Sequence, residues 1–171
     1  MENSVSENEK NLGAFIHLST FLKFFFPLAN FFAPLLLWTL NKEKDFVDVH
    51  GKQAINFQLS IFLYSLVLCA LCIPFVLVFA TDFISLVDAI DHTVREVRFS
   101  EIKNLSGYIL LFALVAILLF GLFVFELYAV INATIHAANG KLYKYPLSIS
   151  FIKTTPQLES GQNQSKNEHV S

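Results

Sequence analysis

Glu126 is the residue whose type and position most strongly suggest chemistry, because it interrupts a long apolar run, 108–138. A carboxyl group inside such a run is costly to bury and often belongs to a proton or ion pathway. One interpretation of Glu126 is therefore a proton or cation relay. The other is a structural ion pair with a cation such as Lys23 or Lys52, or a carboxyl group close to the membrane surface.

Histidines are the second feature with chemical potential. His17, His50 and His136 would lie on one side of a membrane if the first apolar segment enters it and returns. Two imidazoles on facing helices can ligate haem or a metal ion. However, His50 stands in a charged segment and His136 near the end of an apolar run, where water can satisfy both. The pattern therefore favours a polar cluster that joins helices by hydrogen bonds, with no cofactor and no metal.

The candidate site consists of the polar residues expected on that side and inside the adjoining helix ends. They are His17, Asp48, His50, Asn56, Gln58, Glu126, Asn132 and His136. The sequence has no GxSxG, no HExxH and no phosphate-binding glycine loop, so we expect no enzymatic activity. Cys69 and Cys72 stand three residues apart in an apolar run, which favours packing over redox chemistry.

The composition predicts an integral membrane protein. Of the 171 residues, 54% are hydrophobic and 15% are charged, whereas soluble domains carry roughly 25% charged residues. The 12 basic residues are scattered singly or in pairs and the net charge is -2, which excludes a nucleic-acid-binding face. Acidic residues at the N-terminus argue against a cleaved secretory signal. The expected partners are the lipid bilayer and, as open alternatives, other membrane proteins or further copies of the chain.

We predict an all-α membrane bundle with three spanning helices, preceded by a short re-entrant or interfacial helix. Lys23 and Pro27 divide the first apolar stretch, because a lipid-facing ammonium group and a proline inside a helix are both costly. Residues 1–11 and 154–171 are expected to be polar tails around a membrane domain at 12–153, and the second tail to be disordered. The predicted helices cover 12–25, 27–40, 54–80 and 108–138, of which the last three cross the bilayer.

The connections between these helices set the expected orientation. Residues 41–53 are expected to form a charged loop. In 81–107, apolar residues recur at helical spacing, which predicts an amphipathic helix at about 83–98, with an ordered loop as the alternative. Six lysines in 41–53 and 139–153 oppose three basic residues in 81–107. This excess places the 41–53 loop and the C-terminus in the cytoplasm, for a protein of the bacterial inner membrane.

Several segments together resemble a bacterial family of small membrane proteins related to the channel-like small subunit of the chloroplast Tic import translocon. They are His17–Ser19, Pro34–Trp38, Asp45–Ser60 and His136–Lys153. The resemblance implies three or four transmembrane helices but no defined activity. We therefore expect a structural, assembly or protein-translocation role. A small-solute or ion channel using Glu126 and the His/Asn cluster is the alternative, and a haem or redox membrane protein is a third.

Overall fold

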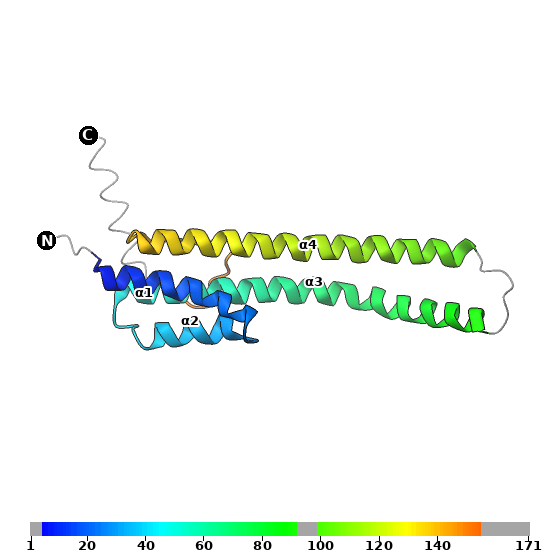
Figure 1. Ribbon diagram of the computed structural model, residues 1–171, viewed down its shortest axis with the longest axis horizontal. Helices are drawn as coiled ribbons and strands as arrows, with labels where there is room; N and C mark the ends of the chain where they lie inside the picture. Colours follow the sequence, from blue (N-terminus) through cyan, green and yellow to red (C-terminus); the bar gives the residue numbers. More distant parts are fainter. Residues whose placement is uncertain (1–4, 92–98, 155–171) are drawn as a thin grey trace, which may run out of the picture. The chain divides into compact units, whose positions relative to one another are not determined.

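The computed structural model describes residues 5–91 and 99–154, and within these ranges the chain forms helices and no strands. In chain order, the elements are α1 (Glu7–Leu18), the 3-10 helix η1 (Ser19–Phe24), α2 (Ala29–Thr39), α3 (Asp45–Asp91) and α4 (Phe99–Ala138), as Figure 1 shows. The all-α prediction is confirmed for these residues. The chain divides into two compact units, which are described separately.

Unit 1 contains α1, η1, α2, the first part of α3, the last part of α4 and the segment that follows α4. α1 begins five residues before the predicted start, because Ser6 and Glu9 form a capping box in which each side chain accepts a hydrogen bond from the other residue's backbone N–H. The Ser-x-x-Glu spacing is the sequence signal for this helix start.

α1, η1 and α2 form a hairpin, here called the N-terminal hairpin, and both of its ends lie at the same end of unit 1. Trp38, near the end of α2, donates a hydrogen bond to Asp48, close to the start of α3. Asn30, near the start of α2, donates one to Gln58, ten residues further along α3. α2 therefore runs antiparallel to α3. The hairpin turns at residues 25–28, where Leu28 takes a left-handed φ of 63°.

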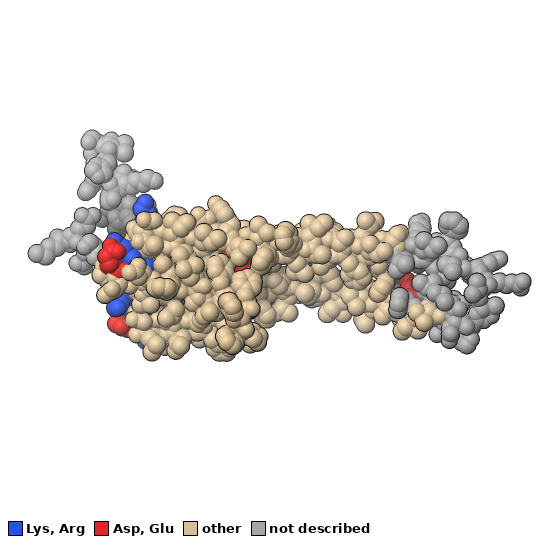
Figure 2. All heavy atoms as spheres, in the orientation of Figure 1, with Lys and Arg blue, Asp and Glu red and all other residues tan. Residues whose placement is uncertain are grey.

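The apolar core of unit 1 joins the hairpin to α3. Ile16, Val47 and Ala54 are fully buried, and Leu12, Leu37 and Trp38 pack against them. Gly51 allows the closest approach, because a Cβ atom at this position would lie 2.3 Å from the Trp38 ring. On the face shown in Figure 2, charged side chains of this unit gather where α1 begins and α4 ends, and the surface of α2 is largely uncharged.

Unit 2 comprises residues 62–125 of α3 and α4, with 92–98 outside the described residues. Most of its described side chains are apolar and exposed. Phe79 contacts the rings of Tyr108 and Phe112, and the Tyr108 hydroxyl donates a hydrogen bond of 2.9 Å to Asp82. A surface so rich in exposed aliphatic and aromatic groups suits lipid rather than water.

Two helices of the described residues are long and apolar enough to cross a membrane, Asp45–Asp82 and Ser106–Ala138. The prediction of three crossings is not confirmed. The third candidate, 27–40, corresponds to α2, which has 11 residues. At about 1.5 Å per residue, α2 is roughly 16 Å long, about half of the hydrocarbon thickness of a bilayer.

Two predicted connections are helical instead. The expected charged loop at 41–53 lies mostly within α3, which begins at Asp45. Its charges alternate with buried side chains, so the segment has one charged face and one packed face. α3 continues to Asp91, so the part of the expected amphipathic helix at 83–91 is the end of α3, and the remainder, 92–98, lies outside the described residues.

Candidate functional site

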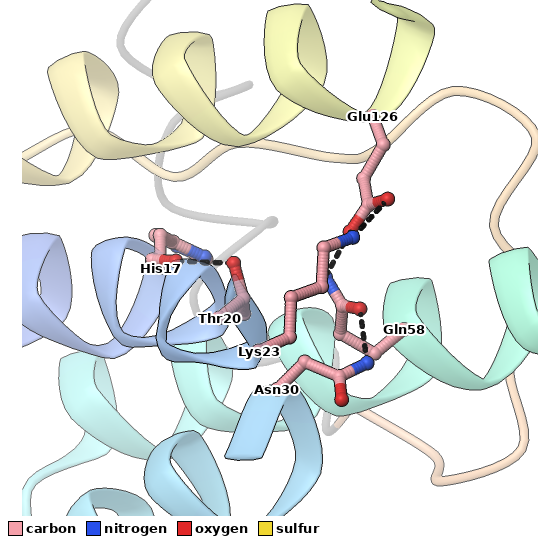
Figure 3. A network of polar contacts seen from close by, with 6 residues as sticks. All are labelled: His17, Thr20, Lys23, Asn30, Gln58 and Glu126. Atoms are coloured by element: carbon pink, nitrogen blue, oxygen red, sulfur yellow. Dashed lines mark hydrogen bonds and ion pairs between the residues drawn. The ribbon is translucent and has the colours of Figure 1, made fainter. Parts of the chain in front are cut away.

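Four polar side chains inside unit 1 form a network, here called the polar network: Lys23, Asn30, Gln58 and Glu126. Each comes from a different element, η1, α2, α3 and α4 (Figure 3). The Lys23 ammonium lies 2.5 Å from both carboxylate oxygens of Glu126. Gln58 donates to Glu126 at 3.2 Å and accepts from Asn30 at 2.9 Å. Both carboxylate oxygens and the Gln58 amide are thus used within the chain.

The ion pair is the most buried charged contact of the described residues. The Glu126 side chain is 4% exposed and that of Lys23 is 23% exposed. A buried ion pair costs desolvation energy that only good geometry and additional hydrogen bonds offset. Here the bidentate contact with Lys23 supplies the geometry, and the Gln58 amide supplies an additional hydrogen bond. The expected ion pair between Glu126 and Lys23 is therefore present in the structure.

A second group, the histidine cluster, consists of His17, His50 and Tyr145. His17 Nε2 lies 2.8 Å from His50 Nδ1, and His17 Nδ1 lies 2.9 Å from the Tyr145 hydroxyl. Tyr145 also stacks on Phe57, with ring centroids 4.1 Å apart. All three cluster members are buried. The expectation that water satisfies His50 is therefore wrong: this residue lies in the interior of unit 1, on the packed face of α3.

Hydrogen bonding in the histidine cluster runs in one of two directions. Either Tyr145 donates to His17 and His17 donates to His50, or each bond has the opposite donor. In both cases His50 Nε2 has no hydrogen-bond partner among the described residues. Burial, with the neighbouring His50, lowers the pKa of His17 well below its ordinary value of 6.5. Burial likewise raises the pKa of Tyr145 well above 10. Both side chains are therefore uncharged at neutral pH.

The segment after α4 is bound to α3 through its backbone. The Asn56 side chain donates to the carbonyl of Ile152 and accepts from the Ile152 N–H, both at 2.8 Å. Ser60 accepts from the N–H of Ile149 at 2.8 Å. Two helix side chains therefore satisfy backbone polar groups of this segment. Asn56 thus binds the C-terminal segment and does not join the polar network.

Of the remaining predicted site residues, Asp48 and Asn132 belong to neither group, and His136 lies beside the histidine cluster, where its ring contacts Tyr143, which in turn contacts Tyr145. Asp48 accepts hydrogen bonds from Trp38 and Lys52. Asn132 donates to the Tyr128 carbonyl of its own helix, and His136 bonds to the Asn132 carbonyl. The structure thus brings together His17 with His50, and Gln58 with Glu126, but does not bring the eight residues into one site. Across 5–91 and 99–154, no three His, Cys, Asp or Glu side chains are grouped as metal ligands.

Sequence reasoning missed Asn30 and the burial of Tyr145. Asn30 is a lone amide in an apolar stretch, which is the signal that could have identified it. Tyr145 is 3% exposed and hydrogen-bonded inside unit 1, and its place in the segment after the last apolar run gives no sign of this burial. Cys69 and Cys72 both carry free thiols on α3. Neither side chain is buried in the structure, so both lie on the surface of α3 among other apolar residues.

Comparison with known proteins identifies one family. The model of the magnetosome magnetite crystal formation protein family (MamF/MmsF) matches residues 8–152, which include all of unit 2, most of unit 1 and every residue of the polar network and the histidine cluster. No curated protein and no solved structure matches the chain. This match corrects the resemblance to the Tic-related membrane proteins, because the family assigned to the same segments is a different one.

Proposed function

This chain belongs to the magnetosome magnetite crystal formation protein family, and on that premise we propose that it acts in magnetite crystal formation as a non-enzymatic structural or assembly component of a membrane. The two long apolar helices support the membrane location. We further propose the bacterial inner membrane, with the C-terminus in the cytoplasm. Reporter fusions before α1 and after Lys153 should both be cytoplasmic, and a periplasmic signal from either would contradict this orientation.

The polar network is the observation that carries the structural role. Polar side chains inside apolar helices are costly unless they serve transport, catalysis or helix association. Here one side chain from each of four elements is bonded to another member of the network. The arrangement joins the N-terminal hairpin to α3 and α4. It therefore supports a structural role, in which the protein maintains a defined arrangement of helices in a membrane.

Transport of a small solute or ion is the second candidate function. It is favoured by one observation, the ionisable pair inside apolar helices, of which Lys23 keeps 23% of its side chain exposed. The two functions make opposite demands on Glu126. Transport needs its ability to bind a proton or cation, whereas a structural role needs only that the buried space is filled without an orphaned charge.

The experiment uses magnetite-forming cells that lack their own member of this family. The wild-type chain, Lys23→Met, and the double variant Lys23→Met/Glu126→Leu are each expressed, and crystal number and size are measured by electron microscopy beside protein abundance. Wild type should restore normal crystals, and Lys23→Met should fail because it leaves Glu126 as an orphaned charge. The double variant should restore them, because two apolar side chains replace the pair.

Each outcome decides between the proposals. If wild type changes neither crystal number nor size, the function in crystal formation is wrong. If the double variant is as abundant as wild type but restores no crystals, Glu126 is needed for its chemistry, and transport replaces the structural role. In that case, proteoliposomes should show ion flux with wild type and none with Glu126→Gln.

A further inference from the structure

The N-terminal hairpin has a large apolar surface that unit 1 does not cover. Its turn consists of exposed side chains, with Phe25 at 77% and Phe26 at 68% exposure, and exposed apolar residues continue along α2. The exposed apolar residues include Leu28 at the turn and Phe32, Leu35 and Leu36 on α2. Because α3 and α4 of the same chain carry apolar stretches of membrane-spanning length, lipid acyl chains are the occupant that fits this surface.

The hairpin reaches only part of the way across a bilayer. Between the Trp38–Asp48 contact and the Asn30–Gln58 contact, the chain advances ten residues along α3, which is roughly 15 Å. The first contact lies beside Lys52 at the charged end of unit 1, where headgroups are expected. The turn at residues 25–28 therefore lies near the middle of a hydrocarbon layer about 30 Å thick.

The hairpin is held at this depth by tertiary contacts. Lys23, next to the turn, is bound by Glu126, which draws the base of the turn against α4. Leu28 adopts a left-handed backbone conformation that a leucine rarely takes. Residues in such conformations persist only where the surrounding structure imposes them. The turn is thus a fixed feature of unit 1.

We propose that the N-terminal hairpin is an insertion into one lipid leaflet that makes this chain prefer, and promote, membranes that curve convexly toward the side of the helix ends. α1 with η1, and α2, add two helical cross-sections, each about 80 Å² for a diameter of about 10 Å, to one leaflet. They add none to the other, because the hairpin returns before crossing. A leaflet that gains area alone expands relative to its partner, and bending relieves the difference. This inference stands independently of the role in crystal formation.

The depth of the turn is tested with the full chain in vesicles of neutral and anionic phospholipid. In a Cys69→Ser/Cys72→Ser background, single cysteines at positions 25, 40 and 128 carry nitroxide labels. The label at 25 should match that at 128, an exposed position on α4 two residues from Glu126, with high access to oxygen and low access to a water-soluble nickel complex. The label at 40 should show the reverse. A label at 25 as accessible to nickel as that at 40 would show that the hairpin lies flat, and the proposal would be wrong.

Curvature preference is tested by reconstituting dye-labelled protein into small and large vesicles of the same lipid. Because the hairpin and the C-terminus are expected on the same side of the membrane, a C-terminal dye that an external quencher reaches marks molecules with the hairpin in the outer leaflet. Only these molecules are counted. Their density per unit area should be severalfold higher on the small vesicles. Equal density on both sizes overturns the proposal even if the turn is deep.

The variants assign the effect to the hairpin. Phe25→Ala/Phe26→Ala should weaken the enrichment about twofold, because the inserted volume is smaller, and Phe25→Glu/Phe26→Glu should abolish it, because the charges withdraw the turn to the headgroups. The matched control, Phe75→Ala/Phe120→Ala, removes two exposed rings from the spanning helices and should leave the enrichment unchanged. If the control weakens it as much as the hairpin alanine variant, the hairpin is not its cause.

Discussion

Removing one member of the Lys23–Glu126 pair should destabilise unit 1 far more than removing both. The perturbation is a double-mutant cycle of Lys23→Met, Glu126→Leu and the combination. Breaking a buried pair by deleting one partner costs about 3–5 kcal/mol, whereas replacing both partners by apolar groups is often neutral or stabilising. The contact fits this case, because the ammonium reaches both carboxylate oxygens and the Glu126 side chain is 4% exposed.

The geometry places Lys23→Met at the lower end of that range. The orphaned carboxylate keeps the hydrogen bond from Gln58, which offsets part of the cost of burying its charge. We therefore expect a loss of about 3 kcal/mol for Lys23→Met, about 3–5 kcal/mol for Glu126→Leu, and within about 1 kcal/mol of wild type for the double variant.

The assay is reversible unfolding in mixed micelles, followed by the fluorescence of Trp38, the single tryptophan of the chain. Trp38 contacts Gly51 and bonds to Asp48, so its emission reports whether α2 is docked on α3. The control cycle is Glu7→Gln and Lys10→Met, an ion pair on the surface of α1, which should show a coupling below about 0.5 kcal/mol. If the losses at Lys23 and Glu126 simply add in the double variant, the pair is not an energetic unit and the reasoning fails.

Three further predictions concern other parts of unit 1. Burial lowers the pKa of His17, so below pH 6.5 the unfolded chain takes up a proton that the native chain does not bind. The free energy of unfolding should therefore be highest above pH 6.5 and fall by up to about 1.4 kcal/mol per pH unit below it. Micelle unfolding at pH 7.5 and 5.5 measures this slope, which should be shallower in His17→Gln. In the same assay, Gly51→Ala should lower the free energy of unfolding by about 1–3 kcal/mol or more, because its methyl group would overlap the Trp38 ring. Gly121→Ala, which has open space around it, should raise this free energy by up to about 1 kcal/mol. Asn56→Ala should release the segment 147–153 and speed its cleavage by protease, while Asn132→Ala, whose side chain bonds only within α4, should not; equal rates in both variants would contradict the assigned role of Asn56.

The sequence predicts the parts of this fold that depend on composition and local pattern. The apolar runs identify the helices, and a lone carboxyl group at Glu126 with a lone ammonium group at Lys23 is enough to suggest the ion pair, because each is costly alone in an apolar run. The family match gives the coarse role of a membrane protein in crystal formation, and it is compatible with the expected structural or assembly role.

Features that depend on tertiary contacts escape this reasoning. The start of α3 carries the charged residues Asp45, Asp48 and Lys52, and this density of charge is typical of a loop. His50 and its neighbours nevertheless face a packed interior, which only the fold shows. Tyr145 follows the last helix by several residues, and only the fold shows that the chain returns to place its hydroxyl on His17. Likewise, the length of α2 depends on where the turn before it ends, which the backbone of Leu28 determines.

The contact between Lys23 and Glu126 has a consequence for how the protein is made. The two residues are separated by 103 positions in the chain. At a synthesis rate of about 5–20 residues per second, the ribosome produces Glu126 roughly 5–20 s after Lys23. During this time the first-made segment has an ammonium group without its carboxylate partner, even after the apolar span of α3, Asp45–Asp82, has been made. The contact that joins the hairpin to α4 is therefore made last, after its hydrogen bonds with α3 can already form.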